Sequence, residues 1–271
     1  MSEQVGGVAG RKVIPEQGRP WAELEAHMRE QGGKDVDWRN GKAAVYVFNS
    51  GDDVMQVAHD AYGLFIAENG LGAAAFPSLR GMEAEVVQMA LSLQNAPEGA
   101  SGCMTSGGSE SILLAIKACR DYVAANRPVD GVPEILAPYS VHPAFDKGAQ
   151  LMGLKVVRVP CAADFRADVE AMAAAITPNT VMLVGSAPCF PYGLIDPMDE
   201  LSELALARDL WLHVDACVGG YLNPFMAAVS DVQIEPYDFA LPGVSSMSLD
   251  LHKYAYAAKG ASTVLYRSKA L

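Results

Sequence analysis

Short apolar runs of strand length alternate with helical stretches along the chain from Gly107 onward. Apolar and β-branched runs bounded by turn residues are typical of buried strands, and longer segments with apolar residues three and four apart are typical of helices. Their alternation predicts βα units and a largely parallel sheet flanked by helices, which is an α/β fold. The predicted strands are 134–137, 155–159, 181–184, 211–214, 244–249 and 262–266, and the predicted helices are 109–124, 143–152, 166–176 and 198–208.

The amino-terminal part of the chain lacks this alternation. Residues 1–50 are polar and glycine-rich and are predicted to form an arm with one short helix over 21–29. An amphipathic helix is predicted over 82–93, where apolar side chains recur on one helical face. We therefore predict a large domain at 51–271 after the arm. Because no helical segment follows the last predicted strand to cover it, a small C-terminal domain is expected to be missing from this large domain.

Composition and charge narrow the function classes. The 271 residues include 20 Lys and Arg against 32 Asp and Glu, a formal net charge of −12. Broad nucleic-acid binding is disfavoured, because neutralising the phosphate backbone requires Lys and Arg. No apolar run approaches the ~20 residues that a membrane helix needs, and the amino terminus has no apolar core of the secretory type. No membrane span is predicted, and the cytoplasm is the expected location.

The cysteines and histidines indicate neither a metal site nor a disulfide framework. The five cysteines are scattered, with no pair at CxxC spacing, which favours buried thiols in a reducing compartment. The five histidines include no HxxxH or HExxH pair. We therefore predict no metal site.

A glycine pair precedes a predicted helix in the stretch Met104-Thr-Ser-Gly-Gly-Ser-Glu-Ser111. The glycines Gly107 and Gly108 would let an anion approach the backbone closely, and the helix N-terminus favours negative charge. Ser109 could cap the helix and still offer its hydroxyl to a phosphate oxygen. The stretch matches neither GxGxxG nor GxxxxGK[ST], which disfavours a dinucleotide or P-loop site. An ordinary Gly-Gly turn with a serine cap would explain the same residues.

Two further strand ends carry chemical groups. Asp215 ends the predicted strand 211–214, and the carboxyl ends of parallel strands border the crevice where α/β proteins bind ligands. Lys253 follows the predicted strand 244–249, and a lysine in such a crevice can form a Schiff base with an aldehyde. Taken singly, Asp215 could cap a turn and Lys253 could be a solvated surface lysine.

The three features together predict a site for pyridoxal 5'-phosphate. This cofactor needs an anchor for its phosphate, a carboxylate that keeps its pyridine nitrogen protonated, and an amine for its aldehyde. The Gly107–Ser109 cradle, Asp215 and Lys253 supply these groups in turn. His142, which ends a strand-loop segment, could stack on the ring of the cofactor.

Four blocks of the sequence closely resemble the sphingosine-1-phosphate lyase family of the group II pyridoxal-phosphate decarboxylase superfamily. They occur in the order found in the family. The blocks are TSGGSESILLAIKACRD (105–121), TVMLVGSAPCFPYGLIDP (180–197), LHVDACVGGYLNPFM (212–226) and SSMSLDLHKYAYAAKGASTVLY (245–266). The resemblance implies the large domain of the aminotransferase-like fold type I, and a homodimer with active sites at the subunit interface.

The resemblance also implies roles for individual residues. Lys253 corresponds to the lysine that forms the Schiff base, Asp215 to the partner of the pyridine nitrogen, and His142 to the ring-stacking histidine. Gly108, Ser109 and His252 correspond to ligands of the cofactor phosphate. Lys259 corresponds to the second lysine of the HKYGYAPKG block, which is implicated in holding the substrate's phosphate; Asn69 and Tyr256 complete the expected substrate-binding set.

The chain departs from the family in the substrate-binding part. The family stretch Asn-Pro-Leu-His is Asn-Gly-Leu-Gly at 69–72, Phe-Pro-His-Gly is Phe-Pro-Tyr-Gly at 190–193, and HKYGYAPKG carries alanines at 255 and 258. The membrane-anchoring helix of eukaryotic members is not found here, and members continue for well over a hundred residues into a small C-terminal domain. The residues that correspond to cofactor ligands are retained.

Three functions are therefore considered. The first is a carbon–carbon lyase that cleaves a phosphorylated 3-hydroxy amine, a retro-aldol reaction, to an aldehyde and phosphoethanolamine. Its base is not identified, and Lys253 after release, Tyr254 and Tyr256 are the candidates. The second is a pyridoxal-phosphate-dependent amino-acid decarboxylase, which would not need Lys259. The third is a truncated, non-catalytic paralogue that dimerises.

Overall fold

A computed structural model describes residues 13–72 and 74–271, so the first twelve residues of the predicted arm lie outside it. The chain divides into two compact units, one ending at Val47 and the other comprising Phe48–Leu271. The first unit contains helix α1 (Trp21–Gly32), which starts where the sequence predicts a helix and ends three residues later, and the 3-10 helix η1 (Trp38–Asn40). None of the residues of α1 is buried.

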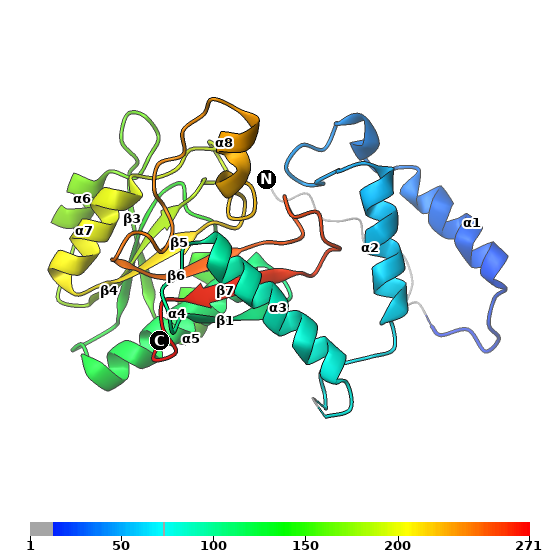
Figure 1. Cartoon of the computed structure of the whole chain (residues 1–271), viewed down its shortest axis with the longest axis horizontal. Helices are drawn as coiled ribbons and strands as arrows, with labels where there is room; N and C mark the ends of the chain where they lie inside the picture. Colours follow the sequence, from blue (N-terminus) through cyan, green and yellow to red (C-terminus); the bar gives the residue numbers. More distant parts are fainter. Residues whose placement is uncertain (1–12, 73) are drawn as a thin grey trace. The chain divides into compact units, whose positions relative to one another are not determined.

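The second unit is built on one seven-stranded sheet in the order β1-β7-β6-β5-β4-β2-β3 (Figure 1). All strands point the same way except β7, which is antiparallel to both of its neighbours. The predicted α/β class with a mostly parallel sheet is confirmed. The strands are β1 (Ser101–Thr105), β2 (Glu134–Pro138), β3 (Lys155–Val159), β4 (Thr180–Ser186), β5 (Trp211–Asp215), β6 (Val244–Leu249) and β7 (Ser262–Tyr266).

Strand β1 was not predicted, because its sequence Ser-Gly-Cys-Met-Thr has no apolar run. Its pairing with β7 supplies the hydrogen bonds that hold it in the sheet. The strands approach each other closely at Gly102, where a Cβ atom would lie 2.7 Å from the Leu265 side chain. A strand of this kind depends on its neighbour more than on its own composition.

Helices cover both faces of the sheet. One buried cluster lies between the sheet and α4 and α5, and a second lies between the opposite face and α3, α6 and α7. The helices of this unit are α2 (Asp52–Leu64), α3 (Pro77–Leu93), α4 (Gly108–Asn126), α5 (Ala144–Met152), α6 (Val169–Ala174), α7 (Met198–Arg208) and α8 (Met226–Val229), with the 3-10 helix η2 (Asn223–Phe225).

Two helix predictions need correction, and helices α2 and α8 were not predicted. Helix α3 begins at Pro77, five residues before the prediction, because proline is well suited to the first turn of a helix. Helix α6 is shorter than predicted, since it starts only after Asp168, whose side chain caps it by accepting from Ala171 N at 2.9 Å. Helix α2 was not predicted, and none of its residues is buried.

The direction of the strands brings the predicted site residues toward one edge of the sheet. The carboxyl ends of β1, β2, β5 and β6 all lie at that edge, because these four strands run in the same direction. The glycine pair follows β1, His142 follows β2, Asp215 ends β5 and Lys253 follows β6. Segments separated by up to about half of the chain therefore meet at this carboxyl edge.

Candidate active site

The cradle predicted for a phosphate lies at the N-terminus of α4. The helix begins at Gly108, and its cap residue is Gly107, which offers no side chain. The prediction that Ser109 caps the helix is wrong, because Ser109 lies within the first turn. Glu110 instead accepts hydrogen bonds from the backbone N and the hydroxyl of Ser106, both at 2.6 Å. These bonds lower the pKa of the Glu110 carboxyl. The exposed Ser109 hydroxyl remains available to a ligand.

Both glycines of the cradle face residues that follow other strands. A Cβ atom at Gly108 would lie 2.7 Å from Cys217 Sγ and 2.8 Å from Asp250 Oδ2, so no side chain fits there. A Cβ atom at Gly107 would lie 3.9 Å from the His252 ring. The cradle is therefore in contact with the segment 250–253. In the sequence, Asp250 follows Gly108 by 142 residues.

Lys253 is held by an acidic residue at the edge of the sheet. Its Nζ donates to Asp250 Oδ2 at 2.9 Å, and the Asp250 side chain is 3% exposed. Burial alone would lower the pKa of Lys253. Against this, the negative charge of Asp250, its hydrogen bond from Lys253 and the charge of Asp215 raise that pKa and favour the ammonium form. Lys253 therefore rests as an ammonium ion paired with Asp250.

Asp250 is a site residue that the sequence analysis missed. It follows β6 directly, which is the signal that singled out Asp215 after β5. Its Oδ1 atom is buried without a hydrogen-bond partner among the described residues. A buried carboxylate oxygen without a donor is costly, so this atom is suited to receive a donor from a bound group or from Lys253 in another rotamer.

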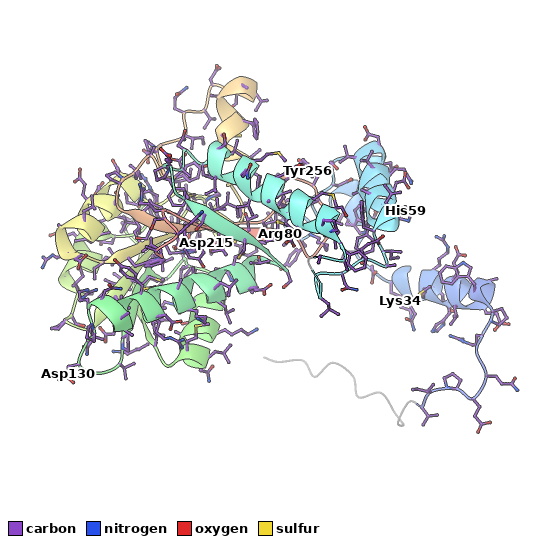
Figure 2. All side chains as sticks on the ribbon, turned by 60° about the horizontal axis from the view of Figure 1, so that its bottom comes forward. Lys34, His59, Arg80, Asp130, Asp215 and Tyr256 are labelled. Atoms are coloured by element: carbon purple, nitrogen blue, oxygen red, sulfur yellow. The ribbon has the colours of Figure 1, made fainter. Side chains whose placement is uncertain are left out.

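Asp215, which is labelled in Figure 2, lies at the end of β5. Its exposed fraction is 8%. Its Oδ1 atom accepts from the backbone N of Cys217 at 3.2 Å and from the hydroxyl of Ser248 at 3.4 Å. Two donors on one oxygen fix the orientation of the carboxylate. Asp215 is thus a preorganised anion close enough to Lys253 to affect its charge.

His142 lies in the loop between β2 and α5. Its Nδ1 accepts from the backbone N of Ala144 at 3.1 Å, so in the neutral ring the proton is on Nε2. Arg158 of β3 holds this loop by donating to the carbonyl oxygens of Pro138, Tyr139 and Val141, at 3.2–3.3 Å. No hydrogen bond or ring contact joins His142 to Asp215 or Lys253 in the described part of the chain.

One nitrogen of the His252 ring forms a hydrogen bond with the backbone. Its Nδ1 donates to the carbonyl oxygen of Ala261 at 2.7 Å, which leaves Nε2 for a ligand. Nε2 lies 3.8 Å from Asp250 Oδ2. In the neutral ring this nitrogen has no proton to donate, so binding a phosphate through it requires the imidazolium form.

Two of the residues expected to bind substrate, Lys259 and Tyr256, form hydrogen bonds with the segment that carries Lys253. Lys259 Nζ donates to the carbonyl oxygen of His252 at 3.4 Å and lies 5.4 Å from the ring centre of Phe48. Burial and the nearby Lys253 lower the pKa of Lys259. The backbone N of Tyr256 donates to the carbonyl oxygen of Lys253 at 3.0 Å.

The hydrogen bond of Asn69 is a local one. It lies in the loop between α2 and α3, where its Oδ1 accepts from the backbone N of Leu71 at 3.1 Å. Within the described ranges, no hydrogen bond joins Asn69 to Lys253 or Lys259. The structure therefore brings the predicted cofactor ligands of α4, β5 and the segment after β6 together.

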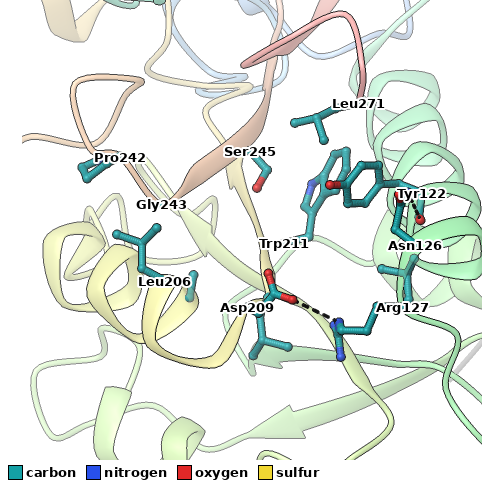
Figure 3. A pocket seen from close by; sticks show the side chains of 13 residues that line it. Tyr122, Asn126, Arg127, Leu206, Asp209, Trp211, Pro242, Gly243, Ser245 and Leu271 are labelled. Atoms are coloured by element: carbon teal, nitrogen blue, oxygen red, sulfur yellow. Dashed lines mark hydrogen bonds and ion pairs between the residues drawn. The ribbon is translucent and has the colours of Figure 1, made fainter.

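A separate pocket lies at the opposite edge of the sheet (Figure 3). Its volume is about 280 Å³, and Trp211 and Ser245, at the starts of β5 and β6, contribute to its wall. Arg127 Nε lies 3.7 Å from Asp209 Oδ2 across it. None of the predicted site residues lines this pocket.

In sequence, the chain resembles known sphingosine-1-phosphate lyases. It is 45% identical over 258 residues to sphingosine-1-phosphate lyase 1 of Mus musculus and 43% identical over 265 residues to the sphingosine-1-phosphate lyase of Arabidopsis thaliana. These alignments cover 95% of this chain but 45% and 48% of the relatives, so the chain spans about half their length.

Two solved structures resemble the chain in fold. The sphingosine-1-phosphate lyase of Burkholderia pseudomallei superposes with a TM-score of 0.90 at 36% identity, covering 97% of this chain and 62% of that one. Glutamate decarboxylase of Lactobacillus brevis shares the fold with a TM-score of 0.83 at 21% identity, covering 96% and 60%. The family model of the pyridoxal-dependent decarboxylase conserved domain matches residues 13–271. The chain therefore belongs to the pyridoxal-dependent decarboxylase family.

Proposed function

We propose that the protein is a pyridoxal-phosphate-dependent carbon–carbon lyase that cleaves a phosphorylated 3-hydroxy amine to an aldehyde and phosphoethanolamine. The observation that carries the proposal is the pair of lysines at the carboxyl edge. Lys253 is paired with Asp250 at the edge where the predicted cofactor ligands meet, and Lys259 is a second cation near it. The similarity to sphingosine-1-phosphate lyases over 95% of the chain supports the same reaction class.

The residues present fit pyridoxal 5'-phosphate. Gly107 and Gly108 have no side chains that could block an anion at the N-terminus of α4, and the nearby Cys217 and Asp250 leave no room for a side chain at Gly108. We assign Gly107, Gly108, Ser109 and His252 to the cofactor phosphate. Asp215 would hold the proton on the pyridine nitrogen. The amine for the cofactor's aldehyde is Lys253.

When bound, the cofactor supplies an electron sink for the carbanion that bond cleavage leaves behind. The other roles in the reaction belong to residues of the chain. Asp215 would keep positive charge on the cofactor ring, and His142 would be available to pack against it. Asp250, which lies 2.9 Å from Lys253 Nζ, would hold the Lys253 amine whenever that amine is free. The proton of the substrate hydroxyl goes to a base, for which Lys253, Tyr254 and Tyr256 are the candidates.

Lys259 separates the lyase from the alternative, an amino-acid decarboxylase. An ammonium group is a compact charge suited to a phosphate, and a decarboxylase does not need a second cation of this kind. The fold itself is shared with glutamate decarboxylase and does not distinguish the two. The geometry favours the lyase because Lys259 is directed toward the segment that carries Lys253.

On the natural full-length protein, Lys259→Ala is expected to reduce kcat/KM for a phosphorylated 3-hydroxy amine by roughly tenfold to a hundredfold, the value of one charge-assisted hydrogen bond. The unphosphorylated analogue should lose far less. Steady-state release of the aldehyde measures both. Lys147→Ala, an exposed lysine of α5, is the matched control and should leave both values unchanged.

Equal losses on the two substrates would contradict the role of Lys259. Conversion of a plain amino acid to its amine and carbon dioxide would favour the decarboxylase. A protein that binds the cofactor but turns over neither class of substrate would favour the non-catalytic paralogue.

We further propose that residues 51–271 form the cofactor-binding domain of a homodimer. Helix α2 supports this proposal, since none of its residues is buried although it carries large apolar side chains. Val57 is 68% exposed and Leu64 75% exposed. Unpaired apolar surface of this kind is typical of a protein–protein interface, here with a second copy of the chain.

Leu64→Asp is expected to convert the dimer to a monomer in sedimentation equilibrium, because an aspartate cannot be buried in an apolar interface without a partner. Leu151→Asp is the control, since Leu151 is 68% exposed on α5. A wild-type protein that sediments as a monomer, or a Leu64→Asp variant that remains dimeric, would contradict the assignment of α2.

The cytoplasm is proposed as the compartment. Cys103, Cys119, Cys161, Cys189 and Cys217 are all free thiols. Free thiols are typical of a reducing compartment. Separately, the described residues include no helix that is long and apolar enough to span a bilayer.

A further inference from the structure

A row of buried polar side chains runs along β5 and β6 toward Asp215. In this pair of strands His213 lies beside Ser246, and Asp215 lies beside Ser248. His213, Ser246 and Ser248 are fully buried, and Trp211 is 5% exposed. The row begins at Trp211, on the wall of the pocket in Figure 3, and ends at the proposed partner of the cofactor nitrogen.

Hydrogen bonds connect each member of the row to the next. Trp211 Nε1 lies 2.7 Å from Ser246 Oγ, which lies 2.8 Å from His213 Nδ1. His213 Nε2 lies 3.2 Å from Ser248 Oγ, and Ser248 Oγ lies 3.4 Å from Asp215 Oδ1. Phe145 of α5 packs edge-on against the His213 ring, with ring centres 5.7 Å apart.

The indole at the start of the row determines the direction of every bond. Trp211 Nε1 can only donate, so Ser246 Oγ accepts from it. Among the described residues, Ser246 Oγ has one other partner, His213 Nδ1. If His213 donated to it as well, the buried hydroxyl hydrogen of Ser246 would be unpaired, at a cost. Ser246 therefore donates to Nδ1, and His213 has its proton on Nε2.

This tautomer of His213 determines the hydrogen bonds at the Asp215 end of the row. His213 Nε2–H donates to Ser248 Oγ, which also receives the thiol of Cys217 at 3.3 Å. With both acceptor positions used, the hydroxyl hydrogen of Ser248 is left for Asp215. Burial lowers the pKa of His213 to about 4, against a smaller opposing effect of Asp215. The ring is thus neutral at pH 7.

We infer that this row positions Asp215, and that Trp211 does so from a distance by setting the tautomer of His213. The inference rests on the proposed role of Asp215 toward the cofactor nitrogen. With the opposite tautomer, Ser248 would donate to His213 and the Asp215 carboxylate would lose one of its two donors. The carboxylate would then be free to rotate away from the ring. Trp211, Ser246, His213 and Ser248 are positioning residues.

Nitrogen NMR of the histidine rings tests the row without any cofactor. In the cofactor-free wild-type protein at pH 7, we expect His213 to be neutral with its proton on Nε2. In Trp211→Phe, which removes the indole donor but keeps an aromatic ring, Ser246 is no longer forced to donate, and we expect a mixture of tautomers. A wild-type ring with its proton on Nδ1, or an unchanged single tautomer in Trp211→Phe, would overturn the inference.

The effect on the site is tested with two serine variants. Ser248→Ala is expected to raise the dissociation constant for pyridoxal phosphate about tenfold, which corresponds to one hydrogen bond to a charged group. Ser202→Ala is the matched control, because Ser202 is 2% exposed in α7 but accepts from the backbone N of Gly243. It is expected to lower the melting temperature without changing cofactor affinity.

The two proposals fail in different ways. An unchanged dissociation constant in Ser248→Ala, or an equal rise in both variants, would overturn the positioning role. Failure of the wild-type protein to bind pyridoxal phosphate would instead refute the proposed function. The NMR measurement on the cofactor-free protein would still decide the direction of the row.

Discussion

Replacement of Lys253 by arginine is expected to abolish covalent attachment of pyridoxal phosphate and to reduce turnover by about 10²–10⁴-fold or more, the range typical of losing a positioned proton-transfer group. Arginine keeps a positive charge beside Asp250, so the variant is expected to fold. Its guanidinium does not lose a proton at neutral pH and cannot attack an aldehyde. The measurement is borohydride reduction of the wild-type and variant proteins, followed by peptide mapping.

The adduct should be found on Lys253 in the wild-type protein and on no lysine in Lys253→Arg. Lys259→Ala serves as the comparison, since it removes the neighbouring amine and should retain the adduct on Lys253. Detection of the cofactor on Lys259, or of an undiminished adduct in Lys253→Arg, would show that the pairing of Lys253 with Asp250 has a different purpose.

Asp215→Asn is expected to leave cofactor binding measurable and to reduce kcat by roughly 10²–10³-fold, the loss typical of one preorganised electrostatic contact. The asparagine side chain has the same shape and can still accept from Cys217 N and Ser248. It has no charge, however, so it cannot hold a proton on the pyridine nitrogen. Steady-state kcat and a cofactor titration followed by visible absorbance separate the two effects.

Asp238→Asn provides the control for this variant. Asp238 is also 8% exposed, but it lies before β6 and accepts from Asn95 and from the backbone of Ala240. Its replacement should lower thermal stability and leave kcat per bound cofactor unchanged. A near wild-type kcat in Asp215→Asn would mean that another group protonates the ring.

The alternation of apolar and helical segments was sufficient to predict the six strands from 134 onward and the α/β class. Buried parallel strands are apolar on both faces, so each is recognisable from its own residues. Strand β1 and helix α2 could not be predicted in this way. The first is held by pairing with β7, and the second has no buried face.

In the candidate site too, some residues could be identified from the sequence, and Asp250 could be identified only from the structure. Gly107 and Gly108 were identified from their place before a predicted helix, and Asp215 and Lys253 from their places after predicted strands. The strand directions bring the segments that carry them to one edge. Asp250 obeys the same rule but became significant only when the structure placed it 2.9 Å from Lys253 Nζ. The roles of these residues remain predictions until the variants are measured.

The sequence by itself therefore determined six of the seven strands, the family resemblance and the residue types needed for the cofactor, because these depend on local patterns and on the order of motifs. The tertiary structure alone decided the pairing of Lys253 with Asp250, the uncapped N-terminus of α4 and the hydrogen-bonded row that ends at Asp215. These depend on distances between atoms of different strands. Such distances are set by strand register and by the packing of helices on the sheet, which no single segment encodes.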